Sequence, residues 1–310
     1  MIPVYIINGF LDSGKTEFIT YTLGQPYFQS RSTTLLLVCE EGENEYDPAL
    51  LKKSRTVMEV IEEEADFQSS NLIALEKKHK PSRIIIEFNG MWNVKNMKFP
   101  WHWKPEQQIT MINGATFSTY FTNMKSLVAE HIRQSELIII NRCDGIEDKV
   151  GSYKRNIMAL NQGAEIIFET AQGEINVTLE EDLPYDIKDN PIILDDMGYG
   201  FFYLDALDNP QRYQGKIVEY TAMVLHPSGF PKGYFVPGRM AMTCCADDMA
   251  FLGYACQYDK EQELKQQSWV KVKAEVKTEF FEDYGKEGPV LYALEVNPAS
   301  KPKNEVISFV

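Results

Sequence analysis

The segment that most constrains the fold of this chain is Gly9–Thr16, which reads GFLDSGKT and has the spacing G-x-x-x-x-G-K-T. It lies between an apolar run and a helical stretch, the strand–loop–helix order that a phosphate-binding loop requires. The alternative is a glycine turn with a surface lysine that has this spacing by chance. Such a turn would require neither the preceding strand nor the following helix. The predicted nucleotide contacts here are Gly9, Asp12, Ser13, Gly14, Lys15, Thr16 and Glu17. Backbone N–H groups would wrap the phosphates, Lys15 would reach the β- and γ-phosphates, and Thr16 would bind Mg²⁺.

The sequence around this loop alternates apolar runs with helical patterns. The apolar runs are 2–7, 33–39, 83–87, 107–112, 136–141 and 164–168. The helical stretches are 15–24, 65–79, 116–134 and 147–160. Such continuous apolar runs are typical of strands buried on both faces of a parallel sheet. We therefore expect an α/β fold of the P-loop NTPase type over residues 1–172, with a parallel sheet flanked by helices.

The composition of the sequence changes after residue 172. Residues 173–210 are acidic and contain Pro and Asn, which indicates a linker or boundary segment. Residues 211–310 carry five β-rich runs separated by Gly and Pro turns: 215–225, 238–245, 250–256, 269–280 and 289–296. This pattern predicts a second, all-β domain, a small closed barrel of OB type.

A base-reading element is predicted at Asn141-Arg142-Cys143-Asp144, directly after the run at 136–140. The Asp144 carboxylate could accept two hydrogen bonds from the guanine N1–H and exocyclic amine, which adenine does not offer. A buried acceptor left unpaired rejects the wrong base strongly. The alternative is common N-x-x-D turn chemistry. With Asn141, Arg142 and Asp144 at a strand end, the sequence favours GTP over ATP.

A third element is the run Ile84-Ile85-Ile86-Glu87, followed by Gly90. An acid at the tip of an apolar strand would point its carboxylate at Mg²⁺ and the attacking water. Gly90 could offer its N–H to the γ-phosphate. The alternative is an acidic strand terminus before a glycine turn. We assign the catalytic roles to Glu87 and Lys15.

Charge and cysteine content restrict the function further. The net charge is −14, which argues against nucleic-acid binding because phosphate contacts require clustered Lys and Arg. No run of residues is long and apolar enough to span a membrane, so we expect no membrane insertion. Five cysteines form no disulfide-framework spacing, which favours reduced thiols and a cytoplasmic location.

The motifs in residues 1–170 resemble those of the CobW/HypB/UreG GTPases, whose members insert or deliver metals. The loop Gly9–Thr16, the segment from Glu40 to Asp47 and the E-F-N-G sequence Glu87–Gly90 all fit the family pattern. The resemblance implies GTP hydrolysis with Mg²⁺ held by Thr16, Glu40, Glu43 and Glu87. Two features depart from it: Asn113 stands where an Asp is frequent, and residues 46–83 lack the cysteine motif of many members.

The C-terminal segment resembles the soluble domain of YcgQ-like membrane proteins. The resemblance rests on the sequence from Gly238 to Asp247, with Arg239 and the adjacent pair Cys244-Cys245. It implies association with metal or small-solute handling. Cys244 and Cys245 are candidate Zn²⁺ ligands, and the alternative is that they are small buried thiols that only pack.

Together these features predict a protein that binds and hydrolyses GTP with Mg²⁺ and couples hydrolysis to the delivery of a metal such as Zn²⁺. The partner would be a metal-receiving client protein or a metal transporter. An alternative is a regulatory GTP switch whose β domain is a metal- or protein-binding module. A nucleic-acid-binding barrel is a third alternative, which the acidic charge disfavours.

Overall fold

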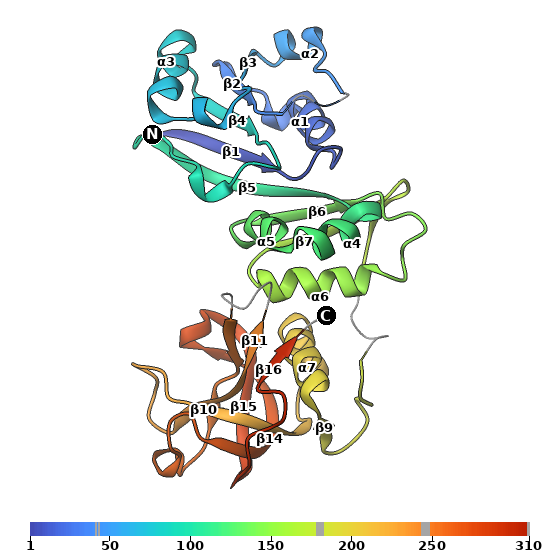
Figure 1. The fold of residues 1–310 in the computed structure, drawn as a ribbon, viewed down its shortest axis with the longest axis vertical. Coiled ribbons are helices and arrows are strands. Elements are labelled where there is room, and N and C mark those ends of the chain that lie inside the picture. Colours follow the sequence, from blue (N-terminus) through green and yellow to red (C-terminus); the bar gives the residue numbers. More distant parts are fainter. Residues whose placement is uncertain (41, 43, 178–182, 243–248, 309–310) are drawn as a thin grey trace. The chain divides into compact units, whose positions relative to one another are not determined.

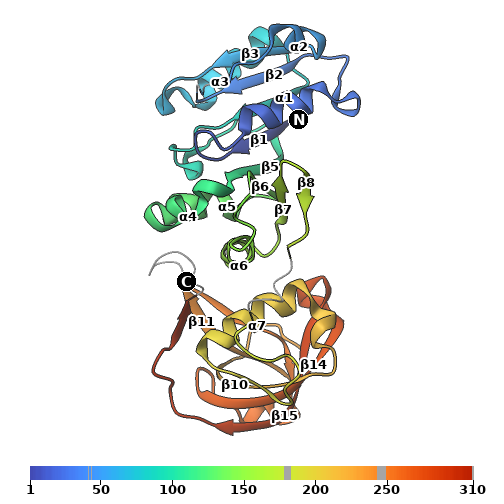
Figure 2. The same ribbon diagram turned by 90° about the vertical axis from the view of Figure 1, so that its right-hand side faces the viewer.

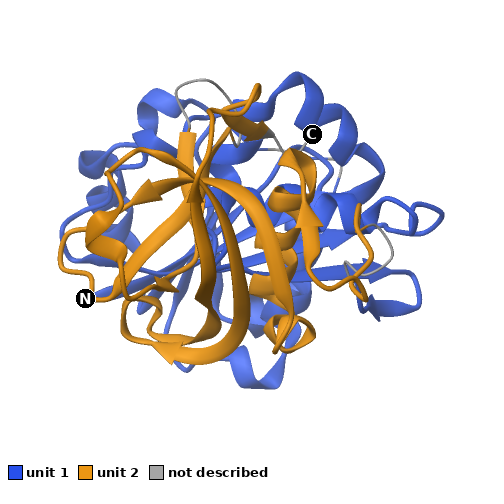
Figure 3. Ribbon diagram, turned by 90° about the horizontal axis from the view of Figure 1, so that it is seen from below, with its two compact units in different colours: residues 1–177 blue, residues 178–310 orange. Residues whose placement is uncertain are grey.

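The computed structural model describes residues 1–310 except 41, 43, 178–182, 243–248 and 309–310. The chain divides into two compact units, Met1–Val177 and Thr178–Val310, which Figure 3 distinguishes by colour. No helix within the described ranges combines the length and apolar character needed to cross a bilayer.

The first unit is built on one sheet with strand order β3-β2-β4-β1-β5-β6-β7-β8 (Figure 1). Every strand pair in it is parallel except β7–β8. The strands are β1 Ile2–Asn8, β2 Thr34–Val38, β3 Thr56–Val60, β4 Arg83–Glu87, β5 Trp103–Asn113, β6 Leu137–Asn141, β7 Glu165–Thr170 and β8 Gly173–Ile175. The expected parallel sheet is therefore confirmed.

Helices cover both faces of this sheet. They are α1 Lys15–Gly24, α2 Pro48–Lys53, α3 Ser69–His79, α4 Gly114–Asn123, α5 Lys125–Arg133 and α6 Val150–Leu160. Apolar residues of α1 and α2 pack with one face of the central strands. Those of α3 pack on the other face beside β1, β2 and β4, whereas α4, α5 and α6 pack against β6 and β7 (Figure 2). The carboxyl ends of β1, β4 and β6 therefore remain free to carry a site, as in open α/β sheets generally.

Three details of the first unit differ from the sequence expectation. Strand β3 and helix α2 were not predicted, because a five-residue edge strand and a six-residue helix carry little periodicity. The expected helix at 116–134 is two helices, α4 and α5, with a break at Met124.

The second unit contains a closed ring of strand pairings. β10 pairs with β11 and β14, β14 with β15, β15 with β13, and β13 with β11. The strands of the unit are β9 Ile192–Leu194, β10 Ile217–Leu225, β11 Tyr234–Met242, β12 Met249–Gly253, β13 Cys256–Gln257, β14 Trp269–Phe281, β15 Lys286–Pro298 and β16 Val306–Ser308. The ring matches the expected small barrel, and its assignment to the OB type stays a prediction.

Alternating burial explains why these segments form a barrel. In β10, Val218, Tyr220, Ala222 and Val224 are buried and the residues between them are more exposed. β14 repeats the pattern over residues 270–276. Because successive strand side chains point to opposite faces, this period of two places one apolar row inside.

The expectation that residues 173–210 form a linker needs correction. The segment contains β8, which joins the first sheet, and β9, which pairs with β10. It also contains α7, Asp196–Asp208, which is buried around most of its circumference. The tyrosine Tyr199 donates from its hydroxyl to the carbonyl oxygen of Leu252 in the second unit at 2.9 Å. The acidic residues of the segment concealed a helix with apolar side chains on most faces, which is the pattern of a buried helix.

Candidate nucleotide-binding site

The loop between β1 and α1 has the backbone geometry of a phosphate cradle. Gly9, Asp12 and Gly14 have φ values of 136°, 59° and 93°. A Cβ at Gly9 would lie 2.2 Å from the carbonyl oxygen of Met111, so no larger residue fits there. These conformations turn the loop back on itself directly before α1 begins at Lys15. The N-terminus of α1 therefore faces the hollow of the loop, where an anion is favoured.

Lys15 lies at the centre of this hollow with its side chain 4% exposed. Its ammonium group donates to the carbonyl oxygens of Gly9 at 2.8 Å and Phe10 at 2.9 Å. The third donor meets Glu40 Oε2 at 2.6 Å. An ammonium has three donors, so all of them are engaged. Glu40, expected among the Mg²⁺ ligands, is thus directed at the lysine.

A second cluster joins Thr16 to the strand tip of β4. The Thr16 hydroxyl donates to Glu87 Oε1 at 2.6 Å, and the Tyr46 hydroxyl donates to Glu87 Oε2 at 2.5 Å. Glu87 is buried. Burial raises the pKa of Glu87, and the two hydrogen bonds oppose that rise. Tyr46 was not predicted, because a single tyrosine inside the 40–47 segment carries no motif.

Gly90 lies directly against the loop. A Cβ at this position would be 2.3 Å from the Gly9 carbonyl oxygen and 2.7 Å from the Phe10 Cα. The neighbouring Asn89 donates from Nδ2 to the Cys39 carbonyl oxygen at 3.1 Å. The segment after β4 therefore contacts both the phosphate loop and the end of β2.

The predicted base-reading residues surround the other end of the loop. Asn141 Nδ2 donates to the Ser13 carbonyl oxygen at 2.8 Å, and Arg142 donates to the Asp12 carbonyl oxygen at 2.6 Å. Both oxygens of Asp144 accept from the backbone N–H of Ala171, at 3.2 and 3.1 Å. Ala171 escaped the sequence analysis because its contribution is a backbone group.

Several buried side-chain polar atoms have no hydrogen-bond partner among the described residues, and two of them belong to the phosphate loop and the base-reading motif. These two are Ser13 Oγ and Asn141 Oδ1. Glu17, in the first turn of α1, accepts from Asn44 at 3.0 Å and lies 3.5 Å from Arg142. An unpaired buried polar atom is unfavourable, so a ligand that paired with these atoms would stabilise the site.

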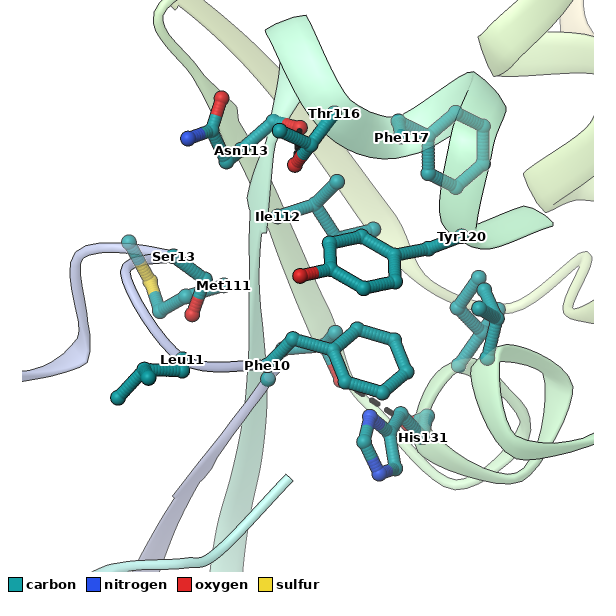
Figure 4. Close-up of a pocket in the computed structure, with 14 residues that line it drawn as sticks. Phe10, Leu11, Ser13, Met111, Ile112, Asn113, Thr116, Phe117, Tyr120 and His131 are labelled. Atoms are coloured by element: carbon teal, nitrogen blue, oxygen red, sulfur yellow. Dashed lines mark hydrogen bonds between the residues drawn. The ribbon is translucent and has the colours of Figure 1, made fainter. Parts of the chain in front are cut away.

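An apolar pocket lies behind the loop (Figure 4). The ring of Phe10 stacks on Tyr120 with centroids 4.5 Å apart and lies 5.2 Å from the ring of His131. Burial lowers the pKa of His131 to about 4, so this imidazole is neutral at physiological pH. Asn113 borders the pocket and caps α4 by accepting from the N–H of Ala115 at 3.0 Å. These contacts anchor the loop to α4 and α5.

Apart from Glu40, which pairs with Lys15, the predicted metal ligands divide into two groups. Thr16 and Glu87 meet, and their hydroxyl and carboxylate oxygens are the hard ligands that Mg²⁺ prefers, so the residues present fit this ion. Glu43, Cys244 and Cys245 lie outside the described residues. Outside the gaps at 41, 43, 178–182, 243–248 and 309–310, no three or more His, Cys, Asp and Glu side chains group to hold a metal ion.

Three other cysteines are buried free thiols: Cys39, Cys143 and Cys256. Burial raises the pKa of each, so they remain protonated and unreactive at neutral pH. Arg239, from the sequence that includes Cys244 and Cys245, is buried and pairs with Asp196 at 2.7 Å.

Comparison with protein families gives two matches. The model described as "CobW/HypB/UreG, nucleotide-binding domain" matches residues 3–168, more than half of the chain. The "DUF1980 C-terminal domain" model matches residues 171–307. No curated protein matches the chain.

The solved structures that match this chain have low sequence identity to it and TM-scores below 0.5. The hydrogenase maturation factor HypB from Archaeoglobus fulgidus is 16% identical, with 56% of this chain and 82% of that chain covered and a TM-score of 0.39. The Zn(II)-bound YjiA GTPase from E. coli is 14% identical, with coverage of 84% and 96% and a TM-score of 0.41. HypB from Helicobacter pylori in complex with nickel is 16% identical, with coverage of 55% and 80% and a TM-score of 0.37.

Proposed function

The chain belongs, through residues 3–168, to the CobW/HypB/UreG nucleotide-binding family, and from this premise we propose that it binds and hydrolyses GTP. The observation that carries the proposal is that Lys15, Thr16 and Glu87 line one pocket at the mouth of the β1–α1 loop, where Thr16 and Glu87 are hydrogen-bonded. These residues supply a cation for phosphate, a hydroxyl for Mg²⁺ and a carboxylate for water in one place.

Phosphate binding follows from the loop and its lysine. The backbone N–H groups from Gly9 to Thr16, with the N-terminus of α1, would hold the β-phosphate. Lys15 would exchange its contact with Glu40 for phosphate oxygens. Gly90, which lies too close to Gly9 and Phe10 for any side chain, would offer its N–H to the γ-phosphate.

Guanine selection is assigned to Asp144 with Asn141 and Arg142. The Asp144 carboxylate accepts from the N–H of Ala171. Guanine would supply N1–H and amine donors to this carboxylate, and its O6 could accept the N–H of Ala171. Adenine has an amine at the O6 position and no N1–H, so it would leave both groups unpaired.

For hydrolysis, Glu87 would orient the attacking water and Lys15 would stabilise charge on the transferred phosphoryl group. Mg²⁺, when bound through Thr16 and Glu87, would neutralise charge on the β- and γ-phosphates. We infer slow unassisted turnover, on the order of 10⁻⁴–10⁻² s⁻¹, as for P-loop GTPases acting without a partner's arginine.

The finer proposal is that GTP hydrolysis is coupled to the delivery of a metal such as Zn²⁺ to a client protein or transporter in the cytoplasm. It rests on the family resemblance and on the Cys244-Cys245 pair. The second candidate is a regulatory GTP switch whose β-rich unit is a metal- or protein-binding module. The separate, compact second unit favours this alternative.

Two experiments test these proposals. Equilibrium titration with fluorescent GTP and ATP analogues in the presence of Mg²⁺ should show a clear preference for GTP, and Asp144→Asn should transfer that preference to xanthosine triphosphate. Equal affinity for ATP and GTP in the wild type would overturn the guanine assignment.

Calorimetric titration of Zn²⁺ into the GTP and GDP forms tests the coupling to metal. A coupling of about 1–3 kcal/mol between the two ligands is expected, and it should be lost in Cys244→Ser and Cys245→Ser. Equal Zn²⁺ affinity in both forms would leave a GTPase without metal coupling.

A further inference from the structure

The Glu87 carboxylate is held by two donors from opposite sides of the site. Thr16 donates to Oε1 at 2.6 Å and Tyr46 donates to Oε2 at 2.5 Å. The side chain of Glu87 is only 2% exposed. Because each oxygen has its own protein donor, the plane and direction of the carboxylate are fixed before any ligand enters. Thr16 belongs to the nucleotide loop, but nothing in the proposed chemistry so far requires Tyr46.

The position of the Tyr46 hydroxyl is set by the packing of its ring. The ring is partly buried against the apolar cluster on the α1–α2 face of the sheet, together with Leu50 and Leu51 of α2. A carboxylate oxygen has no proton to give, so the Tyr46 hydroxyl is the donor in its contact with Glu87 Oε2. The ring therefore belongs to the core while the hydroxyl reaches the site.

The backbone that carries Tyr46 is also fixed. The next residue, Asp47, is the N-cap of α2, and its side chain accepts from the N–H of Ala49 at 2.8 Å. Pro48 begins the helix, where its fixed φ is suited to the first turn. The other end of the 40–47 segment is attached differently, through the Glu40–Lys15 ion pair that a phosphate would replace. The hydrogen bond from Tyr46 to Glu87 can therefore persist when a nucleotide binds, whereas the Glu40–Lys15 ion pair is replaced.

From these contacts we propose that Tyr46 is a positioning residue for Glu87, aligning its carboxylate for Mg²⁺ and for the attacking water. The inference rests on the proposed GTPase function and adds to it a residue outside the recognised loop motifs. Tyr46 transfers no proton and need not touch the nucleotide. Its hydroxyl acts by restricting the orientation of Glu87, as partners behind a metal ligand commonly do.

The test is Tyr46→Phe, which keeps the ring and removes the hydroxyl. Tyr153→Phe is the matched control, because the Tyr153 ring packs in the core of the first unit and its hydroxyl shares a 2.7 Å hydrogen bond with the Ser118 hydroxyl of α4. The full chain is loaded with GDP, and Mn²⁺ affinity is measured by electron paramagnetic resonance. Affinity for GDP in EDTA and the thermal midpoint are recorded in parallel.

We expect Tyr46→Phe to weaken Mn²⁺ binding about 10-fold, the lower end of the range for such positioning partners. GDP affinity in EDTA should stay at the wild-type value, and Tyr153→Phe should retain wild-type Mn²⁺ affinity. In steady-state hydrolysis, kcat should fall while KM for GTP changes little. A purely structural tyrosine would lower the thermal midpoint in both variants without a selective loss of Mn²⁺ affinity, and that result would overturn the proposal.

Failure of this inference is distinguishable from failure of the proposed function. If the wild type bound neither GDP nor Mn²⁺–GDP, the nucleotide site itself would be wrong. If the wild type bound Mn²⁺–GDP and Tyr46→Phe matched it, only the role of Tyr46 would be wrong. Should Tyr46→Phe not fold, Glu87→Met gives a second measurement: hydrogen exchange at residues 46–51 should accelerate when the acceptor is removed. Unchanged exchange would contradict the link.

Discussion

Buried charges are arranged differently in the two units of this chain. In the first unit, Lys15 and Glu87 lie in a site where Glu40 is the partner of the lysine. In the second unit, Asp205 has 0% exposure and accepts from Arg212 with both oxygens at 2.6 and 2.7 Å. Its Oδ2 also accepts from the Tyr213 hydroxyl at 2.6 Å. Ion pairs of the same kind thus lie at an open loop in the first unit and inside a core in the second.

The difference indicates which charges serve a ligand. Lys15 contacts two carbonyl oxygens of a loop bent through left-handed residues and one side chain from a segment with no regular structure at that end. A phosphate can replace such partners. The Asp205 network is closed by residues of α7 and the turn after it, with Tyr185 sharing a hydrogen bond with Tyr213 at 2.6 Å. We infer that the first set of charges binds and the second maintains the fold.

The largest effect expected from this comparison is the loss of nucleotide binding in Lys15→Ala. Removing the ammonium should weaken GTP binding by about 10³-fold, because two or more charge-assisted hydrogen bonds to phosphate are lost. The thermal midpoint of the ligand-free protein should change little, since the partners left by the lysine lie at an open loop. Fluorescence titration with a GTP analogue and a thermal melt measure the two quantities. A variant that unfolded instead would place Lys15 with the structural charges.

The opposite outcome is expected for Asp205→Ala. Removing one partner of a buried pair leaves the other uncompensated, so the free energy of unfolding should fall by about 3 kcal/mol. Asp208→Ala is the control on the same helix, where the side chain is exposed and the change should be within about 0.5 kcal/mol. Urea unfolding monitors both, and GTP affinity under native conditions should be unchanged. Loss of GTP affinity in folded Asp205→Ala would show that the division of roles is wrong.

The sequence predicted some elements of these two units better than others, because only some of them have a clear local sequence pattern. The loop Gly9–Thr16 and the strand β4 were predicted with nearly their observed bounds, because glycine spacing and apolar runs are local properties of the chain. The β-rich runs between Gly and Pro turns predicted β10 and β14 for the same reason. By contrast, α7 was missed because Gly198, Gly200 and its acidic residues mask a helix that is apolar on most sides.

Partners at a site are less predictable than its motifs. The Glu40–Lys15 pair joins residues 25 positions apart, and Tyr46 meets Glu87 across 41 positions. Neither spacing follows from a periodicity, since both depend on how the sheet brings the carboxyl ends of β1, β2 and β4 together. Ala171 directly follows β7, and its N–H donates to Asp144. Any residue except proline at this position would supply that donor.

A smaller effect is expected for Glu87→Gln. This variant tests whether the buried Glu87 takes part in hydrolysis as well as in the structure of the site. The amide keeps the size of the side chain and loses its charge, so GTP should still bind while hydrolysis slows by roughly 10²-fold. Single-turnover phosphate release measures the rate, and the titration used for Lys15→Ala measures affinity. Unchanged hydrolysis would move the water-orienting role to another residue, with Glu43 the next candidate.

The smallest effect is expected for Glu40→Gln. This variant distinguishes two roles of Glu40, partner of Lys15 or ligand of Mg²⁺. Lys15 has three donors and three acceptors in the ligand-free protein, so an incoming phosphate oxygen must displace one of them. Glu40 is the only charged acceptor of the three, and its segment is free of regular structure at that point. The carboxylate therefore competes with phosphate for the lysine.

Neutralising that competitor should tighten GDP binding in EDTA by about 5-fold, or about 1 kcal/mol, a modest gain because desolvation offsets much of the attraction within a mostly buried ion pair. Glu45→Gln removes the same charge from an exposed position of the same segment and controls for the general change in electrostatics. If Glu40 instead ligated Mg²⁺, Glu40→Gln would leave affinity in EDTA at the level of Glu45→Gln and weaken binding only when Mg²⁺ is present. Measuring both variants with and without Mg²⁺ thus decides whether Glu40 is exchanged by the nucleotide or retained beside it.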